Sequence, residues 1–327
     1  MPLRLPAHWI WDFWFAQDGD DVHVFFLHAP RSLGDPELRH RNARIGHAVS
    51  RDLRTWRLLP QPIDVGAPGE FDDLATWTGS VLHADGRWHL FYTGISTSDD
   101  GKVQRIGSAT SDDLVTWRKT GVVLEADPRH YERLHDGVRE EAWRDPWVFH
   151  DADTGRFHML VTARATHGPL DGRGVIGHAT SHDLRTWHAE PPLSEPGEFY
   201  HLEVPQLVHL GDSWRIFFCA MPGDHSSARL ARPGVSAEGG THYLRSDEKL
   251  GPYTVAGDRF LVGGPDTRYY AGRLLAHRGR WHFFAWENRG PDGEFVGRLT
   301  DPMPVLLPAD GTSPLQVLLH DDREPAA

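Results

Sequence analysis

Three acidic residues stand in local sequences that suit bond-breaking chemistry. Asp12 lies inside the aromatic run of residues 9–15, where an ionised carboxylate is costly unless something uses it. Asp145 lies between an arginine and a proline, and Glu203 lies just before a valine and a proline. Two carboxylates on either side of a bond meet the requirement for cleaving a glycosidic linkage, because one protonates the leaving oxygen while the other attacks or activates water. A third acid can hold sugar hydroxyls.

Each acid also has a purely structural interpretation. Asp12 could cap the turn that follows the aromatic run. Arg144 and Asp145 could form an ion pair that stabilises a turn, and Glu203 could be a charge at a strand edge before a proline. These interpretations become less attractive if the three acids occupy equivalent positions of an internal repeat.

The chain contains such a repeat. A string of seven mostly aromatic and aliphatic residues recurs five times, at residues 22–28, 88–94, 157–163, 214–220 and 281–287. A second string, ending in Asp-Leu-x-Thr-Trp, follows the first three copies at residues 45–56, 106–117 and 176–187, with weaker counterparts at 243–253 and 295–300. The second string predicts a strand, a tight turn at Asp-Leu and a Trp that opens the next strand.

A further strand is predicted just before each copy of the first string, at residues 9–15, 75–83, 142–150, 201–209 and 269–277. A unit of four antiparallel strands that recurs with this period is the signature of a β-propeller, whose blades close around a central channel. Long helical periodicity is absent. We therefore expect an all-β, five-bladed β-propeller with four antiparallel strands per blade, forming a single catalytic domain over residues 1–327.

The first strand of each blade is expected to line the channel. Alignment of these strands places equivalent positions near Asp12, Thr78, Asp145, Glu203 and Ala271. No Cys or His cluster has metal-ligand spacing, so we expect nucleophilic and acid/base carboxylate chemistry with no metal and no cofactor. Histidines that recur with the repeat are expected to be packing residues: His23, His89, His158 and His282.

Composition limits the partners. The chain has 327 residues with 39% hydrophobic residues, enough for a substantial core. A net charge of −12 without a basic run predicts no nucleic-acid and no membrane partner, and the 13 Trp suit stacking on sugar rings. One cysteine excludes an intramolecular disulfide, and residues 1–6 contain no apolar segment of the signal-peptide kind. We expect a cytoplasmic protein that binds a small-molecule carbohydrate.

On these residues the chain resembles the fructoside-active β-propeller enzymes of glycoside hydrolase families 32 and 68, in clan J. Residues 9–15 lie where family 32 has Trp-Met-Asn-Asp-Pro-Asn-Gly, and residues 11–14 are similar to the Trp-Asp-x-Trp of family 68. Residues 144–146 reproduce the Arg-Asp-Pro motif, and residues 203–205 match the Glu-Cys-Pro or Glu-Arg-Pro motif. Residues 77–80 and 266–271 are similar to the family strings Trp-Ser-Gly-Ser and Asp-x-Gly-x-x-Phe-Tyr-Ala.

The resemblance implies a role for each acid. Asp12 would be the nucleophile, Asp145 the stabiliser of the transition state and Glu203 the general acid/base. Substrate-binding roles are implied for Trp11, Trp14, Trp77, Thr78, Ser80, Arg144 and Tyr270. The implied activity is that of a retaining glycoside hydrolase, β-fructofuranosidase-like, which cleaves or transfers a terminal β-fructofuranosyl residue from a small fructoside such as sucrose or a fructo-oligosaccharide.

The chain departs from family 32 in three places. Trp11 and Trp14 replace the Asn residues of the nucleophile motif, and Val204 replaces the Cys beside the acid. The C-terminal β-sandwich of family 32 is expected to be missing, because the last blade-like strand, at residues 315–320, nearly ends the chain.

Two other functions are compatible with this pattern. An inverting, arabinofuranosidase-like enzyme of the family 43 type also uses three acids on five blades, and a sugar-binding propeller would need the blades alone. Retention predicts carboxylates about 5–5.5 Å apart, against about 6.5–9.5 Å for inversion. The implied mechanism needs a Glu203 that is protonated at rest, and the apolar neighbours Leu202 and Val204 together with a charged Asp12 nearby are expected to favour that form. The sequence leaves open the fructoside and its linkage, hydrolysis against transfer, a structural calcium and the oligomeric state.

Overall fold

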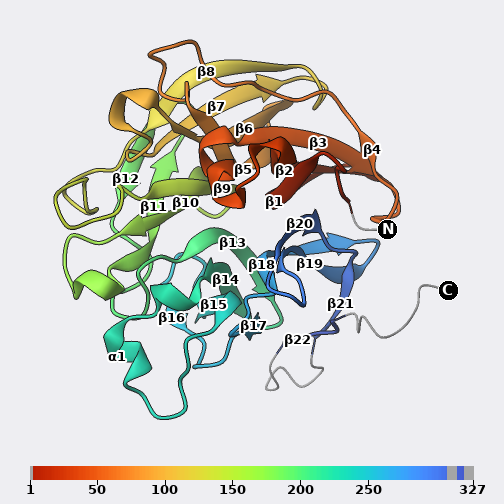
Figure 1. The fold of residues 1–327 in the computed structure, drawn as a ribbon. Helices are drawn as coiled ribbons and strands as arrows, with labels where there is room; N and C mark the ends of the chain where they lie inside the picture. Colours follow the sequence, from red (N-terminus) through yellow and green to blue (C-terminus); the bar gives the residue numbers. More distant parts are fainter. Residues whose placement is uncertain (1–2, 308–314, 320–327) are drawn as a thin grey trace.

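A computed structural model describes residues 3–307 and 315–319. Five antiparallel sheets follow one another around a central axis in chain order (Figure 1). Their innermost strands each contact the next around the ring, and the last contacts the first. These inner strands are β1 (His8–Asp18), β5 (Ala75–Ala84), β9 (Trp143–Asp151), β13 (Glu203–Leu210) and β18 (Tyr269–His277). The predicted five-bladed β-propeller is confirmed.

Blades one to three each have four strands that pair in chain order from the channel outward. Their remaining strands are β2 (Asp21–Pro30), β3 (Arg44–Ser50), β4 (Arg57–Leu58), β6 (Arg87–Ile95), β7 (Arg105–Ser111), β8 (Trp117–Leu124), β10 (Arg156–Arg164), β11 (Gly174–Ser181) and β12 (Trp187–Glu190). The repeated strings of the sequence therefore correspond to the second and third strands of the blades.

Blades four and five have the same plan with one extra short strand each. Blade four adds β14 (Ser213–Ala220), β15 (Gly239–Ser246), β16 (Thr254–Val255) and β17 (Val262–Gly264), the last pairing with β15. Blade five adds β19 (Arg280–Arg289), β20 (Phe295–Leu299), β21 (Met303–Leu306) and β22 (Gln316–Val317). Both β20 and β21 pair with β19, so they share the third place in the blade. His320, the end of the last strand expected from the sequence, lies outside the described residues.

The Asp-Leu turn of the second string has a definite cause in blade one. The carboxylate of Asp52 accepts hydrogen bonds from the backbone N–H groups of Arg54 (2.8 Å) and Thr55 (2.6 Å). The hydroxyl of Ser50 accepts one from the N–H of Leu53, whose φ of 62° is left-handed. Blades two and three repeat this arrangement around Asp113 and Asp183. The repeat thus fixes how a third strand turns into a fourth.

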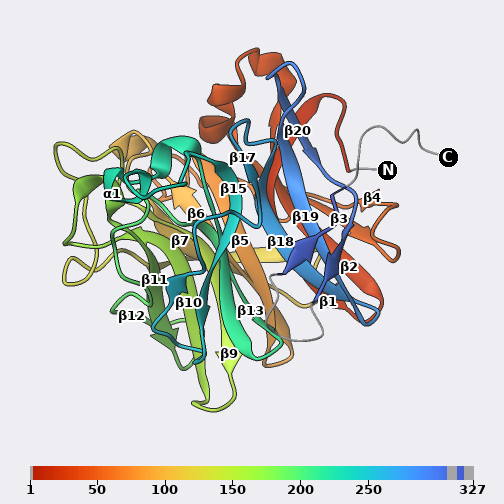
Figure 2. The ribbon, with the colours of Figure 1, turned by 90° about the horizontal axis from the view of Figure 1, so that it is seen from below.

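Short helical turns lie in the connections between second and third strands. Because neighbouring strands are antiparallel, these connections gather at the end of the propeller where the inner strands begin. The turns are η1 (Arg31–Leu33), η2 (Pro36–Asn42), η3 (Thr97–Asp99), η4 (Leu170–Gly172), η5 (Pro222–Asp224) and α1 (Ser227–Leu230). Figure 2 shows η2 beside β20, where the guanidinium of Arg39 lies 4.4 Å from the ring centroid of Phe295.

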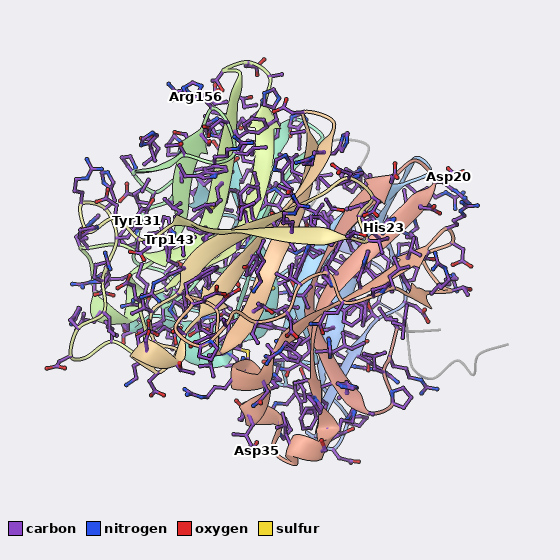
Figure 3. The ribbon with its side chains drawn as sticks, turned by 90° about the horizontal axis from the view of Figure 1, so that it is seen from above. Asp20, His23, Asp35, Tyr131, Trp143 and Arg156 are labelled. Carbon is purple, nitrogen blue, oxygen red and sulfur yellow. The ribbon has the colours of Figure 1, made fainter. Side chains whose placement is uncertain are left out.

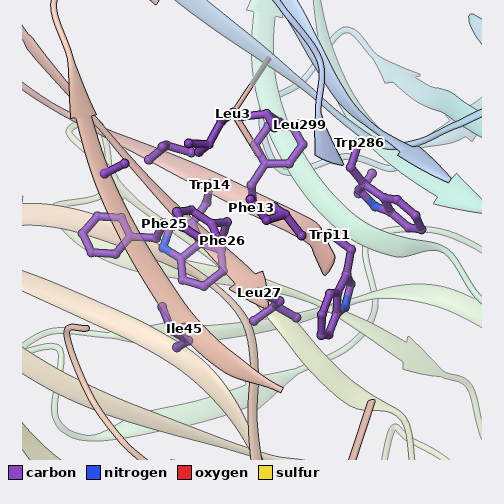
Figure 4. Close-up of a cluster of buried hydrophobic side chains, with 14 of the residues drawn as sticks. Leu3, Trp11, Phe13, Trp14, Phe25, Phe26, Leu27, Ile45, Trp286 and Leu299 are labelled. Carbon is purple, nitrogen blue, oxygen red and sulfur yellow. The ribbon is translucent and has the colours of Figure 1, made fainter. Parts of the chain in front are cut away.

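Aromatic side chains fill the space within and between blades. The ring of Trp14 stacks on Phe25 at a centroid distance of 6.0 Å, within a buried cluster that joins blade one to its neighbours (Figure 4). Tyr131 and Trp143, labelled next to each other in Figure 3, pack with their ring centroids 4.7 Å apart, and the hydroxyl of Tyr131 donates to the carbonyl of Glu190 (2.6 Å). Tyr131 therefore anchors the long connection between blades two and three, which supplies part of the site described below.

Two of the repeat histidines pair inside their sheets. The rings of His23 and His47 are joined by a 2.9 Å hydrogen bond, and His158 and His178 form the same pair in blade three. All four side chains are buried. Among residues 3–307 and 315–319, no group of three or more His, Cys, Asp or Glu side chains could hold a metal ion, and no helix is long and apolar enough to span a membrane.

Candidate active site

A cavity of about 710 Å³ opens where the inner strands begin. Eight of the ten residues singled out in the sequence line it: Trp11, Asp12, Trp77, Thr78, Arg144, Asp145, Glu203 and Tyr270. They come from all five inner strands. The fold therefore brings together side chains from opposite ends of the chain, such as Trp11 and Tyr270.

The other two predicted substrate-binding residues lie in the core, away from this cavity. Trp14 is fully buried against Phe25, at the opposite end of the aromatic cluster from Trp11 and Trp286 (Figure 4). Ser80 is buried two positions deeper than Thr78, and its hydroxyl accepts the backbone N–H of Val148 (3.1 Å), which ties β5 to β9. Both residues were predicted to bind substrate because they belong to the motif strings of residues 11–14 and 77–80. Side chains only two positions apart in a strand can nevertheless face different surroundings.

Each inner strand carries a bulge near its start, and the bulge decides which side chain reaches the cavity. Pairing with the second strand is interrupted at Asp12 in blade one and at Thr78 in blade two. The corresponding residues of the other blades have left-handed φ angles: 59° at Asp145, 56° at Val204 and 48° at Ala271. A bulge bends the strand locally and re-aims the neighbouring side chains.

The bulges correct the alignment made from the sequence. Asp12 and Asp145 do occupy equivalent positions, but the equivalent residue in blade four is Val204. Glu203 lies one position earlier, where the other blades have Trp11, Trp77, Arg144 and Tyr270. The alignment was wrong by one residue because the number of residues in a bulge cannot be counted from hydrophobic patterning.

Asp12 is held by two side-chain donors. The hydroxyl of Thr78 donates to one carboxylate oxygen (2.7 Å) and the indole N–H of Trp286 donates to the other (3.1 Å). Burial raises the pKa of Asp12, the hydrogen bond from Thr78 lowers it, and the negative charge of Glu203 raises it. Two donors from opposite sides fix the orientation of the carboxylate, as a nucleophile requires.

Asp145 is the most enclosed of the three acids. One of its oxygens accepts the hydroxyl of Thr162 (2.8 Å) and the backbone N–H of Val204 (3.2 Å), and Nε of Arg144 lies 3.5 Å from the same oxygen. Burial raises the pKa of Asp145 to about 7, against the opposing effect of the Arg144 charge, and Asp12 raises it further. The group is therefore poised to change protonation near neutral pH.

Glu203 is surrounded by polar donors. Nη2 of Arg144 donates to one carboxylate oxygen (2.6 Å), and the hydroxyl of Tyr270 donates to the other (2.5 Å). Of the apolar sequence neighbours of Glu203, Leu202 packs in the core, whereas Val204, itself buried, lines the cavity. The hydrogen bonds from Arg144 and Tyr270 define the orientation of the carboxylate.

Arg144 connects two of the acids. Besides Glu203 and Asp145, its guanidinium contacts the carboxylate of Glu140 (3.1 Å), the side-chain carbonyl of Gln104 (3.1 Å) and Nδ1 of His201 (3.2 Å). The side chain is almost entirely buried, with 6% exposed. A buried arginine with this many partners is rigid, so it fixes the spacing of Glu203 and Asp145.

Several residues of the site were missed in the sequence. Trp286 and Thr162 hold Asp12 and Asp145, yet both belong to the seven-residue string that was interpreted as packing. In the sixth position of this string the five blades have Leu27, Thr93, Thr162, Cys219 and Trp286. Each of these residues pairs with the residue just before the bulge of its blade. Variation at one position of an otherwise hydrophobic repeat was the signal that could have found them.

The rim of the cavity comes from the connections at this end of the propeller. It includes Glu37, Arg39 and His40 of η2, Arg139 and Glu140 of the long connection, Asp224 of η5, and Asn288, Arg289 and Phe295 of blade five. Burial raises the pKa of Asp224 to about 6, and the charge of Glu203 adds to the effect. These residues surround the entrance rather than the three acids.

Comparison with known proteins agrees with this geometry. Residues 15–244 match the N-terminal domain of glycosyl hydrolases family 32. The chain belongs to this family. Its relatives include the raffinose invertase of Escherichia coli, 31% identical over 278 residues that cover 81% of this chain and 52% of the relative. A sucrose-6-phosphate hydrolase of the same organism is 27% identical, over 88% of this chain and 51% of the relative.

Solved structures show the same fold. The inulosucrase from Halalkalicoccus jeotgali bound to kestose superposes with a TM-score of 0.79 at 24% identity, covering 97% of this family 32 chain and 89% of that one. The Bacillus subtilis levansucrase gives 0.73 at 15% identity, covering 96% and 86%. The chain spans about half the length of the curated relatives it matches, and the matched family span begins after Asp12.

Proposed function

We propose that this chain is a retaining β-fructofuranosidase-like enzyme that cleaves or transfers a terminal β-fructofuranosyl residue of a small fructoside. Asp12 attacks the anomeric carbon while Glu203 protonates the leaving oxygen. In the second step Glu203 takes a proton from an incoming water or sugar hydroxyl, which displaces Asp12. Asp145 stabilises the positive charge that develops on the sugar in both transition states.

One observation carries this proposal: three carboxylates from three blades meet in one cavity, and each is held by donors that leave it pointing in a fixed direction. Asp12 has Thr78 and Trp286, Glu203 has Arg144 and Tyr270. A propeller that only bound sugar would have no need of three oriented acids. Family 32 membership favours fructosides over the arabinofuranosides of the family 43 alternative.

The charges of the cavity favour an uncharged fructoside over a sugar phosphate. Six acids line it, Asp12, Glu37, Glu140, Asp145, Glu203 and Asp224, against four arginines, Arg39, Arg139, Arg144 and Arg289. Each arginine already has a protein partner: Glu37, Asp224, Glu203 and the carbonyl of Gly293 respectively. A dianionic phosphate would enter a cavity in which acids outnumber arginines, and the buried guanidinium nearest the acids, that of Arg144, is already taken by Glu203.

The test is a panel of substrates followed by proton NMR: sucrose, raffinose, kestose, sucrose-6-phosphate and an aryl arabinofuranoside. We expect release of fructose with β-configuration in the first-formed product, and kcat/KM for sucrose or raffinose at least tenfold above that for sucrose-6-phosphate. Release of arabinose, or α-fructose as the first product, would contradict the proposal. A preference for the phosphorylated sugar would overturn the charge argument alone. A cytoplasmic location stays a prediction.

A further inference from the structure

Arg273 is a buried cation that the proposed chemistry does not use. It lies on β18, two residues beyond the bulge at Ala271, and only 1% of it is exposed. Among the described residues it forms no ion pair with any carboxylate. Its Nη2 is buried without a hydrogen-bond partner among these residues. Burying a charge without an ion-pair partner is expensive, so the position calls for an explanation.

The contacts of Arg273 join the strands that carry the three acids. Its Nε donates to the backbone carbonyl of Phe13 (3.2 Å), and its Nη1 donates to the carbonyl of Pro205 (2.8 Å). The guanidinium lies over the ring of Trp147, 5.3 Å from its centroid. Phe13 directly follows Asp12 in the chain. Pro205 lies two residues after Glu203, and Trp147 lies two residues after Asp145.

The side chain therefore lies just beneath the floor of the active-site cavity. It lines a second cavity of about 370 Å³ with Trp147, deeper in the channel. Burial lowers the pKa of Arg273 to about 10, so the guanidinium remains charged at neutral pH, and its charge lowers the pKa of Asp12. The cation thus sits within electrostatic reach of the nucleophile without touching it.

We propose that Arg273 is a positioning residue that clamps the nucleophile strand to the acid/base strand from below and places a positive charge beneath Asp12. The proposal rests on the catalytic roles assigned above. Its two carbonyl contacts set the distance between β1 and β13, and with it the separation of Asp12 and Glu203. Displacements of about 1 Å in such a pair can cost about a hundredfold in rate.

Other charged and titratable groups also face Asp12 and must be considered in the test. They are Glu203 from β13, Asp145 from β9, Arg39 from η2 and Cys219 from β14. None of these side chains is itself replaced by a change at position 273, but Arg273 also acts electrostatically on Asp145 and Cys219. A shift in the titration of Asp12 therefore reports Arg273 only where the carboxyl signal of Asp145 is followed beside it.

The experiment compares Arg273→Met, which removes the charge and both hydrogen bonds, with Arg273→Lys, which keeps the charge. Arg229→Met is the matched control, because Arg229 is equally buried but binds Glu198 (2.8 Å) outside the cavity. The titration of Asp12 is followed by carbon-13 NMR of aspartate carboxyl groups, with its signal assigned through Asp12→Asn. The second readout is the pH profile of kcat/KM on the fructoside that the wild type cleaves.

Removal of a positive charge disfavours the carboxylate, so Asp12 should titrate about 0.5–1 pH unit higher in Arg273→Met. The acidic limb of kcat/KM should move with it, and kcat/KM should fall about 10- to 100-fold. Arg273→Lys should keep the wild-type titration but lose part of the activity, since an ammonium cannot reproduce the two-carbonyl clamp. Arg229→Met should change neither readout.

An unchanged Asp12 titration in Arg273→Met, or the same shift in Arg229→Met, would overturn the proposal. If Arg273→Met does not fold, Arg273→Lys decides: wild-type kcat/KM would refute the clamp, and a raised Asp12 titration would refute the charge effect. A wild type that cleaves no fructoside would refute the proposed function, whereas the NMR titration would still decide whether Arg273 acts on Asp12.

Discussion

The outer turns and the inner bulges of the blades follow opposite rules. At the outer turns, blades one, two and three use the same residue types: a serine, an aspartate at position 52, 113 or 183 that accepts two backbone N–H groups, and a leucine with left-handed φ. At the inner bulges the strand pairing is interrupted in all five blades, but the side chains there are of four different types. Asp12, Thr78, Asp145, Val204 and Ala271 occupy the same place.

This difference separates two tasks of the repeat. A turn works through local backbone geometry, so every blade can use the same solution. An active site needs different chemical groups in one place. A ring of equivalent positions supplies them if different blades carry different residues at that position. Variation continues opposite the bulge, where Thr162 and Trp286 hold acids while Leu27 does not. The catalytic machinery is thus carried by the positions at which the repeat is broken.

The largest effect is expected from removing the acids at or directly beside the bulges. Asp12→Asn and Glu203→Gln should each fold normally and lose about 10³-fold or more in kcat/KM, because nucleophilic attack and proton transfer act in the transition state. Steady-state kinetics with matched circular dichroism spectra would check this. In Glu203→Gln, kcat/KM should fall less for an aryl fructoside with a good leaving group than for sucrose, since the oxygen of a good leaving group needs little protonation. Near-wild-type turnover in either variant would remove that residue from its proposed role.

A second effect concerns stability and its dependence on pH. The raised pKa of Asp145, about 7, means that the folded state holds a proton more tightly than the unfolded chain, where the pKa is 3.8. Ionising Asp145 therefore costs stability as pH rises from about 4 to 7, and the cost stays constant above pH 7. Asp145→Asn does not titrate.

Relative to wild type, Asp145→Asn should gain stability across that interval, by up to about 4 kcal/mol at pH 8 compared with pH 4. Urea unfolding at several pH values would measure it, with Asp113→Asn as a control at an outer turn. The pKa of Asp113 is lowered, to about 2, by the backbone N–H donors of Thr116 and Val115, so this control should lose stability above pH 4. A pH-independent difference between wild type and Asp145→Asn would contradict the raised pKa.

The sequence was sufficient for the fold because strand patterning and turn chemistry are local. The strings at residues 22–28 and 45–56 contain the spacing of a blade, and their recurrence predicts the number of blades. Three acids and five further cavity residues could also be named, through motifs. The bulges could not be located, since one extra residue in a strand leaves no trace in hydrophobicity. That is why Glu203 was aligned one position off and Trp14 was assigned to the cavity.

The hydrogen-bond partners that other blades contribute to the acids could not be predicted from the sequence either. The environment of Glu203 was inferred from its neighbours Leu202 and Val204, whereas its actual contacts come from Arg144 and Tyr270 on other blades. Trp286 reaches Asp12 from the far end of the chain, 274 positions away. Only closure of the ring brings these groups together, and closure is a tertiary event that no local pattern contains.

The smallest effect is expected at an outer turn, where the same kind of residue has a purely structural task. Asp52→Ala removes the acceptor for two backbone N–H groups but leaves the cavity untouched. Exposed groups can recover part of the loss by bonding to water, so the cost should be about 1 kcal/mol in the free energy of unfolding. The kcat/KM should equal that of wild type.

Ser50→Ala, which removes the acceptor for the backbone N–H of Leu53, should cost a similar free energy of unfolding and would show whether the turn acts as a unit. A large loss of activity in Asp52→Ala with unchanged stability would mean that the outer turns communicate with the bulges, and that the two tasks of the repeat are not separate.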